Sequence, residues 1–422
     1  MNAILQVPLE VRCIAIALIG IVYAALANWG IYQFSYFHHH LGPWSRTKPE
    51  QGAYSWLDCI PIFGWIQLRR FEKQFGKNYW VRPLIIEIIL PIFLAWLYYY
   101  EVSGGLLPHQ NSVRKMLPQL QPMLHWQYVA HIILIWAMCV ATFIDFDEQL
   151  IPDWVTVPGT WIGLIGSALI GGWHLIEIDR NGLNPTLAPL NACSPGVWAG
   201  WLDGKYGLAI ALFCYSGWCF GLADRRWRTR RGLKVALKIF FARIVRYKPW
   251  FFTVVTLWVL GTIGIIYAHS APVGNWQALL SGLIGMAIAG SIVWAVRIVA
   301  SNALGMEAMG FGDVTLMAMV GTFIGWQPSL LVFFIAPFTS LVFVLVAWIL
   351  TGEKAFPFGP YLCSATLIVL LFWNSIWNGW AANVFGLGTV LLAIMLVALV
   401  AMGAMLTVWR WIRDRFLWVD EA

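Results

Sequence analysis

The chain has 422 residues, of which 60% are hydrophobic and only 11% are charged, and its formal net charge is +7. This composition excludes a soluble globular protein. It does not suit a porin-type barrel either, because the apolar stretches are continuous and not alternating. We therefore expect an all-α polytopic membrane protein, a bundle of about 9–11 transmembrane helices.

The apolar runs define the expected spans in chain order. Two of them, 314–325 and 361–374, are short enough to be half-helices. The expected spans are 13–34, 84–100, 127–144, 154–176, 206–223, 251–269, 277–299, 314–325, 329–350, 361–374 and 384–409.

The first apolar run resembles a secretory signal, because residues 13–27 end in Ala-Leu-Ala. Glu10 stands where a signal would carry positive charge, and the apolar character continues to Phe34. We therefore favour a retained first span over a cleaved signal.

The distribution of Lys and Arg predicts the orientation. With the N-terminus outside and the C-terminus in the cytoplasm, and with Arg297 counted at the inner end of its span, 22 of the 27 Lys and Arg lie on the cytoplasmic side, and the reverse orientation leaves 5 there. The positive-inside rule favours the first arrangement. The cytoplasmic segments are then 35–83, 145–153, 224–250, 300–313, 351–360 and the C-terminal tail.

The chain is expected to divide near residue 125. Residues 1–125 form an N-terminal region with two spans and a cytoplasmic loop, and 126–422 form a multi-span core. Residues 177–203 read as a turn-rich external loop.

A basic cytoplasmic segment, 224–250, interrupts the core. Ten basic residues and no acidic one lie between 225 and 248, and apolar residues alternate with them from Lys234 to Arg246. This pattern favours an amphipathic helix on anionic lipid, with an ordinary topogenic loop as an equal alternative. We expect no nucleic-acid partner. The lipid-facing residues would include Arg225, Arg226, Arg228, Arg230 and Arg231.

The seven cysteines form no CxxC pair and fall mostly in or beside apolar runs, so they read as small buried side chains. A structural zinc site would need clustered ligands. The histidines at 38–40 are a candidate metal tract, but a membrane-proximal loop fits them better. We predict no metal.

Two acidic motifs stand at the ends of apolar runs. Residues 144–153 read Ile-Asp-Phe-Asp-Glu-Gln-Leu-Ile-Pro-Asp, and residues 310–313 read Gly-Phe-Gly-Asp. Carboxylates at membrane depth are costly and usually mark function. The predicted topology places Asp145 and Asp313 on the same membrane face.

Paired carboxylates can hydrolyse a peptide without a metal. One activates a water, the other protonates the carbonyl, and their repulsion separates the two pKa values. Gly310 and Gly312 would allow a tight turn and the approach of an extended substrate. Asp313 would begin the helix that starts at Val314, where the dipole favours a carboxylate.

Each motif also has an ordinary structural explanation. A single Gly-x-Gly-Asp is weak evidence, because Asp often caps helices and Gly often breaks them. Asp147, Glu148 and Asp153 could be solvated loop acids, with Asp153 capping a helix that begins at Trp154.

At these residues the chain resembles the type IV prepilin peptidases, which are GxGD membrane aspartyl proteases. Residues 144–153 resemble the family's first aspartate motif. Residues 307–316, Glu-Ala-Met-Gly-Phe-Gly-Asp-Val-Thr-Leu, resemble the second, and residues 357–361, Pro-Phe-Gly-Pro-Tyr, a segment that follows it. Looser landmarks occur at Asn28, Ile31-Tyr32, Asp58-Cys59-Ile60-Pro61, Trp65, Leu68-Arg69, Arg82 and Glu87.

The resemblance implies an aspartic endopeptidase of the bacterial inner membrane, with Asp145 and Asp313 as catalytic residues. Asp147, Asp153, Gly310, Gly312 and Glu307 would support them. The expected partners are single-span prepilin or pseudopilin precursors. Proteolysis would need no cofactor, while family members often methylate the product with S-adenosylmethionine.

Three departures from the family pattern are visible. The two CxxC pairs that many members carry in the first cytoplasmic loop are missing, which leaves methylation open. Thr315 stands where the family usually has Lys, and 225–248 looks like an insertion.

Two alternatives use the same acids. Presenilin-like proteases pair Gly-x-Gly-Asp with a Pro-Ala-Leu segment, which this sequence lacks. The second alternative is an ion-coupled transporter or an assembly factor. An ion-coupling site would lie nearer the bilayer midplane, whereas these aspartates lie at the ends of spans.

Overall fold

The computed structural model describes residues 6–37, 54–107, 111–179, 186–223, 238, 248–271, 275–306, 308–351 and 357–417. Within these ranges the chain is almost entirely helical and contains one two-stranded hairpin. The predicted fold class, an all-α polytopic membrane protein, is confirmed.

Among the described residues, eight helices are long and apolar enough to cross a membrane. A ninth candidate is a pair of helices, Gly359–Leu371 and Trp373–Phe385, bent by 79° at their junction. Two further expected spans correspond to shorter helices, α7 (Asp153–Leu169) and α12 (Phe311–Ile324). With a rise of about 1.5 Å per residue, helices of 17 and 14 residues fall short of a hydrocarbon core of about 30 Å.

The chain forms two compact units, Met1–Gly159 with Ala336–Asn374, and Thr160–Ile335 with Ser375–Ala422. The helices α7 and α13 (Trp326–Thr351) each begin in one unit and end in the other. The predicted division near residue 125 stays a prediction.

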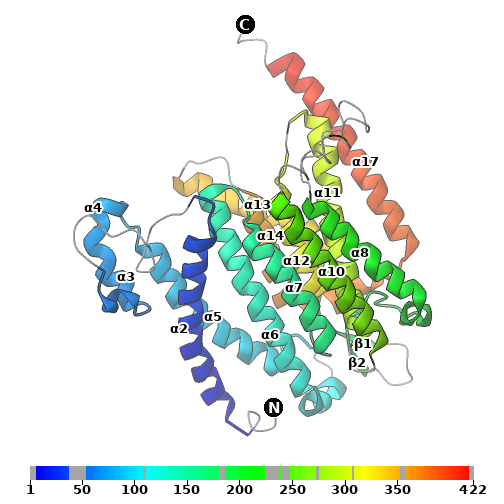
Figure 1. Ribbon diagram of the computed structural model, residues 1–422, viewed down its shortest axis with the longest axis horizontal. Coiled ribbons are helices and arrows are strands. Elements are labelled where there is room, and N and C mark those ends of the chain that lie inside the picture. The colour runs from blue at the N-terminus through cyan, green and yellow to red at the C-terminus, as the bar shows by residue number, and fades with distance from the viewer. Residues whose placement is uncertain are drawn as a thin grey trace. The chain divides into compact units, whose positions relative to one another are not determined.

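The first unit is built on α2 (Leu9–Phe34), α5 (Val81–Val102), α6 (Asn111–Glu148) and α14 (Gly359–Leu371). The helix α2 runs beside α5 and also contacts α6 (Figure 1). Gly20 permits the close approach to α5, since a Cβ there would lie 2.9 Å from Pro91 Cα. The continuous helix through Ala27 to Phe34 fits the expected first span.

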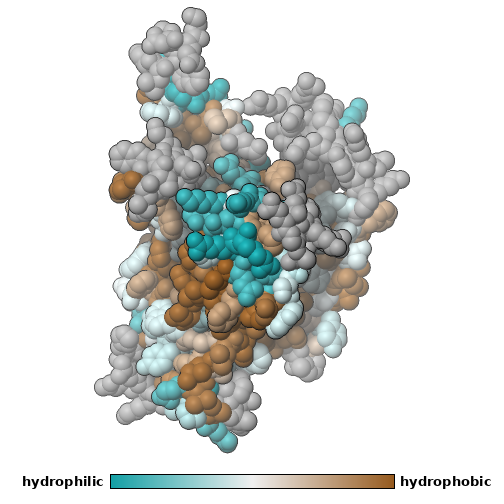
Figure 2. Space-filling view, turned by 90° about the vertical axis from the view of Figure 1, so that its left-hand side faces the viewer, coloured by the Kyte–Doolittle hydropathy of each residue, from teal (hydrophilic) through white to brown (hydrophobic). Residues whose placement is uncertain are grey.

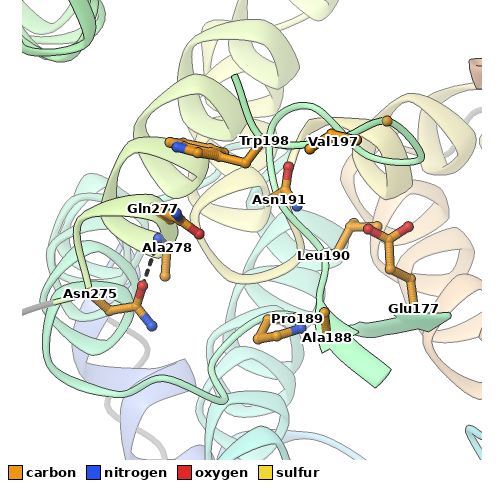
Figure 3. A pocket seen from close by; sticks show the side chains of 11 residues that line it. Glu177, Ala188, Pro189, Leu190, Asn191, Val197, Trp198, Asn275, Gln277 and Ala278 are labelled. Carbon is orange, nitrogen blue, oxygen red and sulfur yellow. Dashed lines mark hydrogen bonds between the residues drawn. The ribbon is translucent and has the colours of Figure 1, made fainter. Parts of the chain in front are cut away.

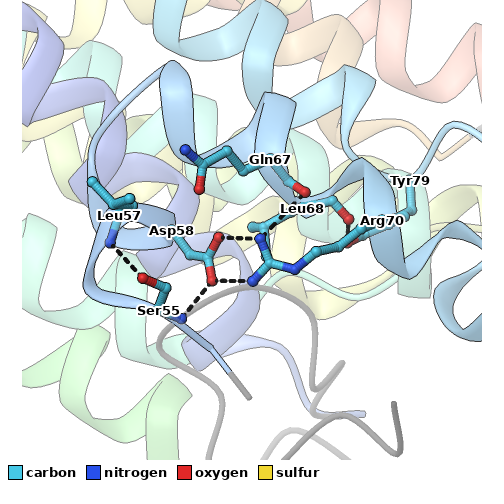
Figure 4. A network of polar contacts seen from close by, with 7 residues as sticks. All are labelled: Ser55, Leu57, Asp58, Gln67, Leu68, Arg70 and Tyr79. Carbon is cyan, nitrogen blue, oxygen red and sulfur yellow. Dashed lines mark hydrogen bonds and ion pairs between the residues drawn. The ribbon is translucent and has the colours of Figure 1, made fainter. Parts of the chain in front are cut away.

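A small helical cap follows α2 in this unit. It comprises η1 (Trp56–Cys59), α3 (Phe63–Leu68), η2 (Arg69–Phe71) and α4 (Glu72–Phe75). The Asp58 carboxylate accepts hydrogen bonds from both Arg70 terminal nitrogens at 2.9 and 2.6 Å and from the Ser55 backbone at 2.7 Å (Figure 4). Exposed polar side chains gather over α3 and α4, above an apolar surface (Figure 2). The sequence predicted a cytoplasmic loop here but not its short helices.

The second unit contains α8 (Lys205–Ala223), α10 (Lys248–Ser270), α11 (Trp276–Leu304), α12 and α17 (Thr389–Ile412). Its centre is α12, which is buried from Asp313 to Ile324 and packs along α11. The two backbones touch at glycines, because a Cβ on Gly285 would lie 2.2 Å from the Gly321 carbonyl oxygen.

The remaining short elements of the described residues are η3 (Gly200–Asp203), α15 (Trp373–Ile376), the π-helical turns Trp377–Ala381 and Arg413–Leu417, and α16 (Ala382–Phe385).

The segment predicted as a turn-rich loop contains an antiparallel hairpin. Strands β1 (Ile176–Asp179) and β2 (Thr186–Pro189) pair Ile176 with Pro189. Four-residue strands are too short for their alternation to show in the sequence.

Candidate active site

Asp145 lies in the last turn of α6, and its residue is only 4% exposed. Its Oδ2 accepts a hydrogen bond from the backbone nitrogen of Gly359 at 3.1 Å. Gly359 is the first residue of α14, so the carboxylate lies at the positive end of a helix dipole. A segment far along the chain therefore helps to hold the Asp145 side chain in place.

A side chain at position 359 would displace the Asp145 carboxylate from this arrangement. A Cβ there would lie 2.5 Å from Asp145 Oδ2 and 2.9 Å from Ile151 Cδ1. The sequence flagged the Pro-Phe-Gly-Pro-Tyr segment as a family landmark, but it did not show that the segment contacts Asp145. The contact explains why a glycine belongs there.

Asp147 and Glu148 are structural partners and not free loop acids. The Asp147 carboxylate forms a two-point ion pair with Arg82, at 2.6 and 2.8 Å. The Glu148 carboxylate accepts hydrogen bonds from the backbone N–H groups of Tyr36 and Phe37, each at 2.8 Å. Both contacts tie the end of α6 to the ends of neighbouring helices, which fixes the turn that carries Asp145.

Several N-terminal landmarks meet at one buried carboxylate, Glu87. Its Oε1 accepts hydrogen bonds from Asn28 Nδ2 at 3.0 Å and from Trp65 Nε1 at 2.8 Å. Its Oε2 accepts one from the backbone of Ile62, which has the unusual φ of 67°. Glu87 therefore joins α2, α3 and α5.

Asp313 lies in the first turn of α12 and is 6% exposed. The helix begins at Phe311, two residues before Asp313, whereas the sequence predicted a start at Val314. Gly310 is the N-cap, and a Cβ on it would lie 3.7 Å from Asp313 Oδ2, an ordinary contact. The Thr315 hydroxyl donates a hydrogen bond to the Gly312 carbonyl at 3.0 Å, so this buried hydroxyl has a partner within the helix.

The loop in front of α12 is held by α11. Gly305 ends α11 with a φ of +75°, a value that favours glycine. Ala308 donates its backbone N–H to Ser301 Oγ at 3.1 Å, and Arg297 Nε donates to the Met309 carbonyl at 2.8 Å. These contacts hold in place the loop that leads to Gly310.

The predicted site residues thus fall in two groups. Asp145, Asp147 and the half-buried Asp153, which opens α7, belong to the first unit. Gly310, Gly312 and Asp313 belong to the second. The pairing of Asp145 with Asp313 stays a proposal. Glu307, the histidines at 38–40 and the arginines at 225, 226, 228, 230 and 231 lie outside the described residues.

The region that contains both groups matches a known family. Residues 132–224 and 241–345 match the model of the type IV leader peptidase family. These two segments of the chain belong to this family.

Relatives of the family include proteins named prepilin leader peptidase/N-methyltransferase. The one from Aeromonas salmonicida is 32% identical over 108 residues, which are 25% of this chain and 35% of the relative. The one from Pseudomonas aeruginosa is 29% identical over 181 residues, 40% of this chain and 58% of the relative. The chain thus matches about a third to just over half of the length of these relatives. No solved structure matched it.

The prediction of no metal concerns the histidines, cysteines and carboxylates of the chain. Among the described residues, no group of three or more His, Cys, Asp or Glu side chains could hold a metal ion. The histidines at 38–40 lie outside these residues, so the absence of zinc stays a prediction.

Proposed function

We propose that this chain is an aspartic endopeptidase of the bacterial inner membrane that uses Asp145 and Asp313. It would cleave the short basic leader of type IV prepilin-like precursors at the cytoplasmic face. The observation that carries the proposal is the placement of two buried aspartates, each at a helix end, inside the segment that matches the leader peptidase family.

The proposed chemistry needs one ionised and one protonated carboxyl group. The ionised group removes a proton from the attacking water, while the other donates a hydrogen bond and then a proton to the scissile carbonyl. When the carbon–nitrogen bond breaks, the leaving amine takes up the proton from the first carboxyl, and the second carboxylate takes back a hydroxyl proton from the gem-diol, which becomes the new carboxyl group. Two carboxylates close together do not both ionise at neutral pH, which supplies the two protonation states.

The neighbours of the two aspartates have positioning roles in this proposal. The Gly359 amide donates to Asp145 and leaves its second oxygen, Oδ1, for the water or for the second aspartate. The Arg82–Asp147 pair fixes the end of α6. For Gly310 and Gly312, the proposed role is to let an extended substrate pass beside Asp313.

The proposed substrate is a single-span precursor with a short, basic, cytoplasmic leader that ends in Gly. A scissile bond just before the apolar helix would lie at the inner interface, where the predicted topology places both aspartates. The relatives named prepilin leader peptidase support this class of substrate. Nothing in the comparisons supports the ion-coupled transporter.

Two finer points belong to the same proposal. The relatives are also named N-methyltransferases, so transfer of a methyl group from S-adenosylmethionine to the new amino terminus is a second candidate activity. We assign no residue of this chain to the methyl donor. The basic segment 224–250 is proposed to bind anionic lipid and not the leader, because two positive regions repel.

The test is to incubate the purified chain, in detergent or vesicles, with leader-bearing precursors and to sequence the products. We expect one cut, directly after the leader Gly, and slower cleavage when that Gly is replaced. Radiolabelled S-adenosylmethionine in the same reaction reports methylation separately. Uncut precursors across a panel of pilins and pseudopilins, with a correctly folded enzyme, contradict the proposal.

A further inference from the structure

The helix α11 leads directly into the loop that carries Gly310 and Asp313, so the contacts at its two ends bear on the candidate active site. At its start, the Asn275 side chain accepts the backbone N–H of Ala278 at 3.2 Å, beside a cavity of about 310 Å³ that the hairpin also lines (Figure 3). At its end, Gly305 turns the chain toward Gly310, and the side chain that lies there comes from α17.

The guanidinium group of Arg410, near the end of α17, lies against Gly305. A Cβ on Gly305 would lie 2.7 Å from both Cζ and Nη1 of Arg410 and 3.0 Å from its Nη2, so the planar group packs on this glycine. The C-terminus of α11 is the negative end of its helix dipole, where a positive charge is favourable. Because Gly305 has no side chain, the guanidinium can come close to that end. Arg410 thus brings a stabilising charge to α11 from a different helix.

A second contact fixes the register of α17 along α11. A Cβ on Gly403 would lie 2.7 Å from Val299 Cγ1, so the two helices also come close at this point. Gly403 and Arg410 are seven residues apart, about two turns, and therefore share one face of α17. Val299 and Gly305 are six residues apart, so the two helices run side by side in the same direction here (Figure 1).

The charges around Arg410 leave an excess of positive charge at this end of α11. Arg410 Nε lies 3.5 Å from the Asp414 carboxylate, which Arg413 also contacts at 2.9 Å, so two guanidinium groups share one carboxylate. The Arg410 side chain is 44% exposed, and solvent therefore weakens its charge interactions. The stabilisation of the end of α11 is modest and local, of the size of a helix-dipole contact.

The contact at Gly305 lies a short way before the candidate active site. The loop runs from Gly305 to Gly310, the N-cap of the helix that carries Asp313, and Arg297 and Ser301 of α11 hold its middle. The helix α17 lies outside the two segments that match the leader peptidase family, so the family match assigns no role to it.

We propose that Arg410 is a positioning residue for Asp313. By holding the end of α11 from a separate helix, it fixes the start of the loop that places this aspartate. The expected effect on cleavage rests on the proposed peptidase function, whereas the contact itself does not. A positioning role concerns the chemical step, so loss of Arg410 should lower kcat and leave the KM for the precursor unchanged.

The experiment compares Arg410→Met with Arg413→Met in the full chain. Both variants remove a guanidinium that contacts Asp414, but the three atoms nearest to a Cβ on Gly305 all belong to Arg410, so Arg413→Met is the matched control. The first measurement, hydrogen–deuterium exchange of residues 305–312, needs no substrate. Arg410→Met should speed exchange there by about two- to fivefold, the size of a helix-dipole effect, and the control should not. Arg410→Lys keeps the charge and should retain most of the protection.

A pair of alanine variants tests the contact if Arg410→Met fails to fold. Gly305→Ala strains the left-handed turn and also places a methyl group against the guanidinium. In an Arg410→Ala background the collision is absent and only the strain remains. The fall in Tm caused by Gly305→Ala should therefore be smaller in that background than in the wild type. Equal falls would show that the two residues do not touch, which overturns the proposal.

The second measurement, cleavage kinetics with a leader-bearing precursor, tests the positioning role. Arg410→Met should lower kcat by about fivefold at unchanged KM, and Arg410→Lys should recover most of the rate. Exchange at the wild-type rate in Arg410→Met, or an equal increase in Arg413→Met, would overturn the contact. Faster exchange with an unchanged kcat, or a rise in KM alone, would overturn the positioning role. A wild-type chain that cleaves no precursor would refute the peptidase function, and the exchange result would still decide the contact.

Discussion

Asp145 and Asp313 are both buried at helix ends. The contact that holds Asp145 and the contacts that hold the loop before Asp313 come from different distances along the chain. The partner of Asp145 is the Gly359 amide, 214 residues away. Asp313 is preceded directly by its own glycine loop, which α11 holds through Arg297 and Ser301. A long-range contact therefore holds Asp145, and the helix that precedes the Asp313 loop holds that loop.

The glycines in the two settings also differ. A Cβ on Gly359 would collide with the Asp145 carboxylate, whereas a Cβ on Gly310 would make only an ordinary contact with Asp313. Gly310 also has the extended dihedral angles φ −69° and ψ 157°, which any residue adopts. A side chain at 359 would thus displace the Asp145 carboxylate, while a side chain at 310 has room in the structure.

The largest expected effect comes from removing either carboxylate. In the proposed mechanism, Asp145→Asn and Asp313→Asn each abolish cleavage, with a loss of about 10⁴-fold or more, as for other cooperating catalytic groups. The amide retains the shape of the side chain, so both variants should accumulate in the membrane like the wild type. Cleavage by either variant near the wild-type rate would exclude an aspartate dyad.

The next effect tests the contrast between the two glycines. Gly359→Ala should displace Asp145 and lower the cleavage rate by roughly 100-fold, the typical effect of misplacing a catalytic group by about 1 Å. Gly264→Ala is the control, because a Cβ on that helical glycine would have nothing within 4 Å, and this variant should cleave normally.

Gly310→Ala sharpens the same comparison. The structure predicts an unchanged Tm for this variant, because a Cβ has room. A selective rise in KM for the precursor would assign Gly310 to substrate passage. A large loss of thermal stability would show that the contrast with Gly359 is wrong.

A smaller effect is expected at the Arg82–Asp147 pair. Both side chains are partly exposed, at 35% and 25%, so loss of the pair should lower the free energy of unfolding by only about 1 kcal/mol. Arg82→Lys keeps the charge but loses the two-point geometry, and we expect about a tenfold lower cleavage rate. The double exchange Arg82→Asp with Asp147→Arg should recover part of the rate; if it recovers none, the pair does not position Asp145.

Much of this fold was readable from the sequence, because membrane spans show as long apolar runs. The two aspartate motifs were also visible, since carboxylates stand out against an apolar background. The contact between Gly359 and Asp145 was not, because periodicity carries no information on pairs so distant along the chain. Likewise Asp147 looked like a loop acid, and only the packing of α5 against α6 reveals Arg82 as its partner.

The hairpin and the helical cap were missed for a different reason. The strands β1 and β2 have four residues each, and α4 has four. Elements of that length are stabilised by tertiary contacts, such as Asp58 with Arg70, and not by local propensity.

The smallest expected effect is that of metal removal. Chelators should change neither the cleavage rate nor the Tm, because the sequence has no CxxC pair and protein contacts hold the first loop. The Asp58–Arg70 pair and the Glu87 hydrogen bonds provide those contacts. Arg70→Gln should therefore lower the Tm although chelation does not. A metal would hold this loop if chelation lowered the Tm and the purified protein contained stoichiometric zinc that was lost when the histidines at 38–40 were replaced.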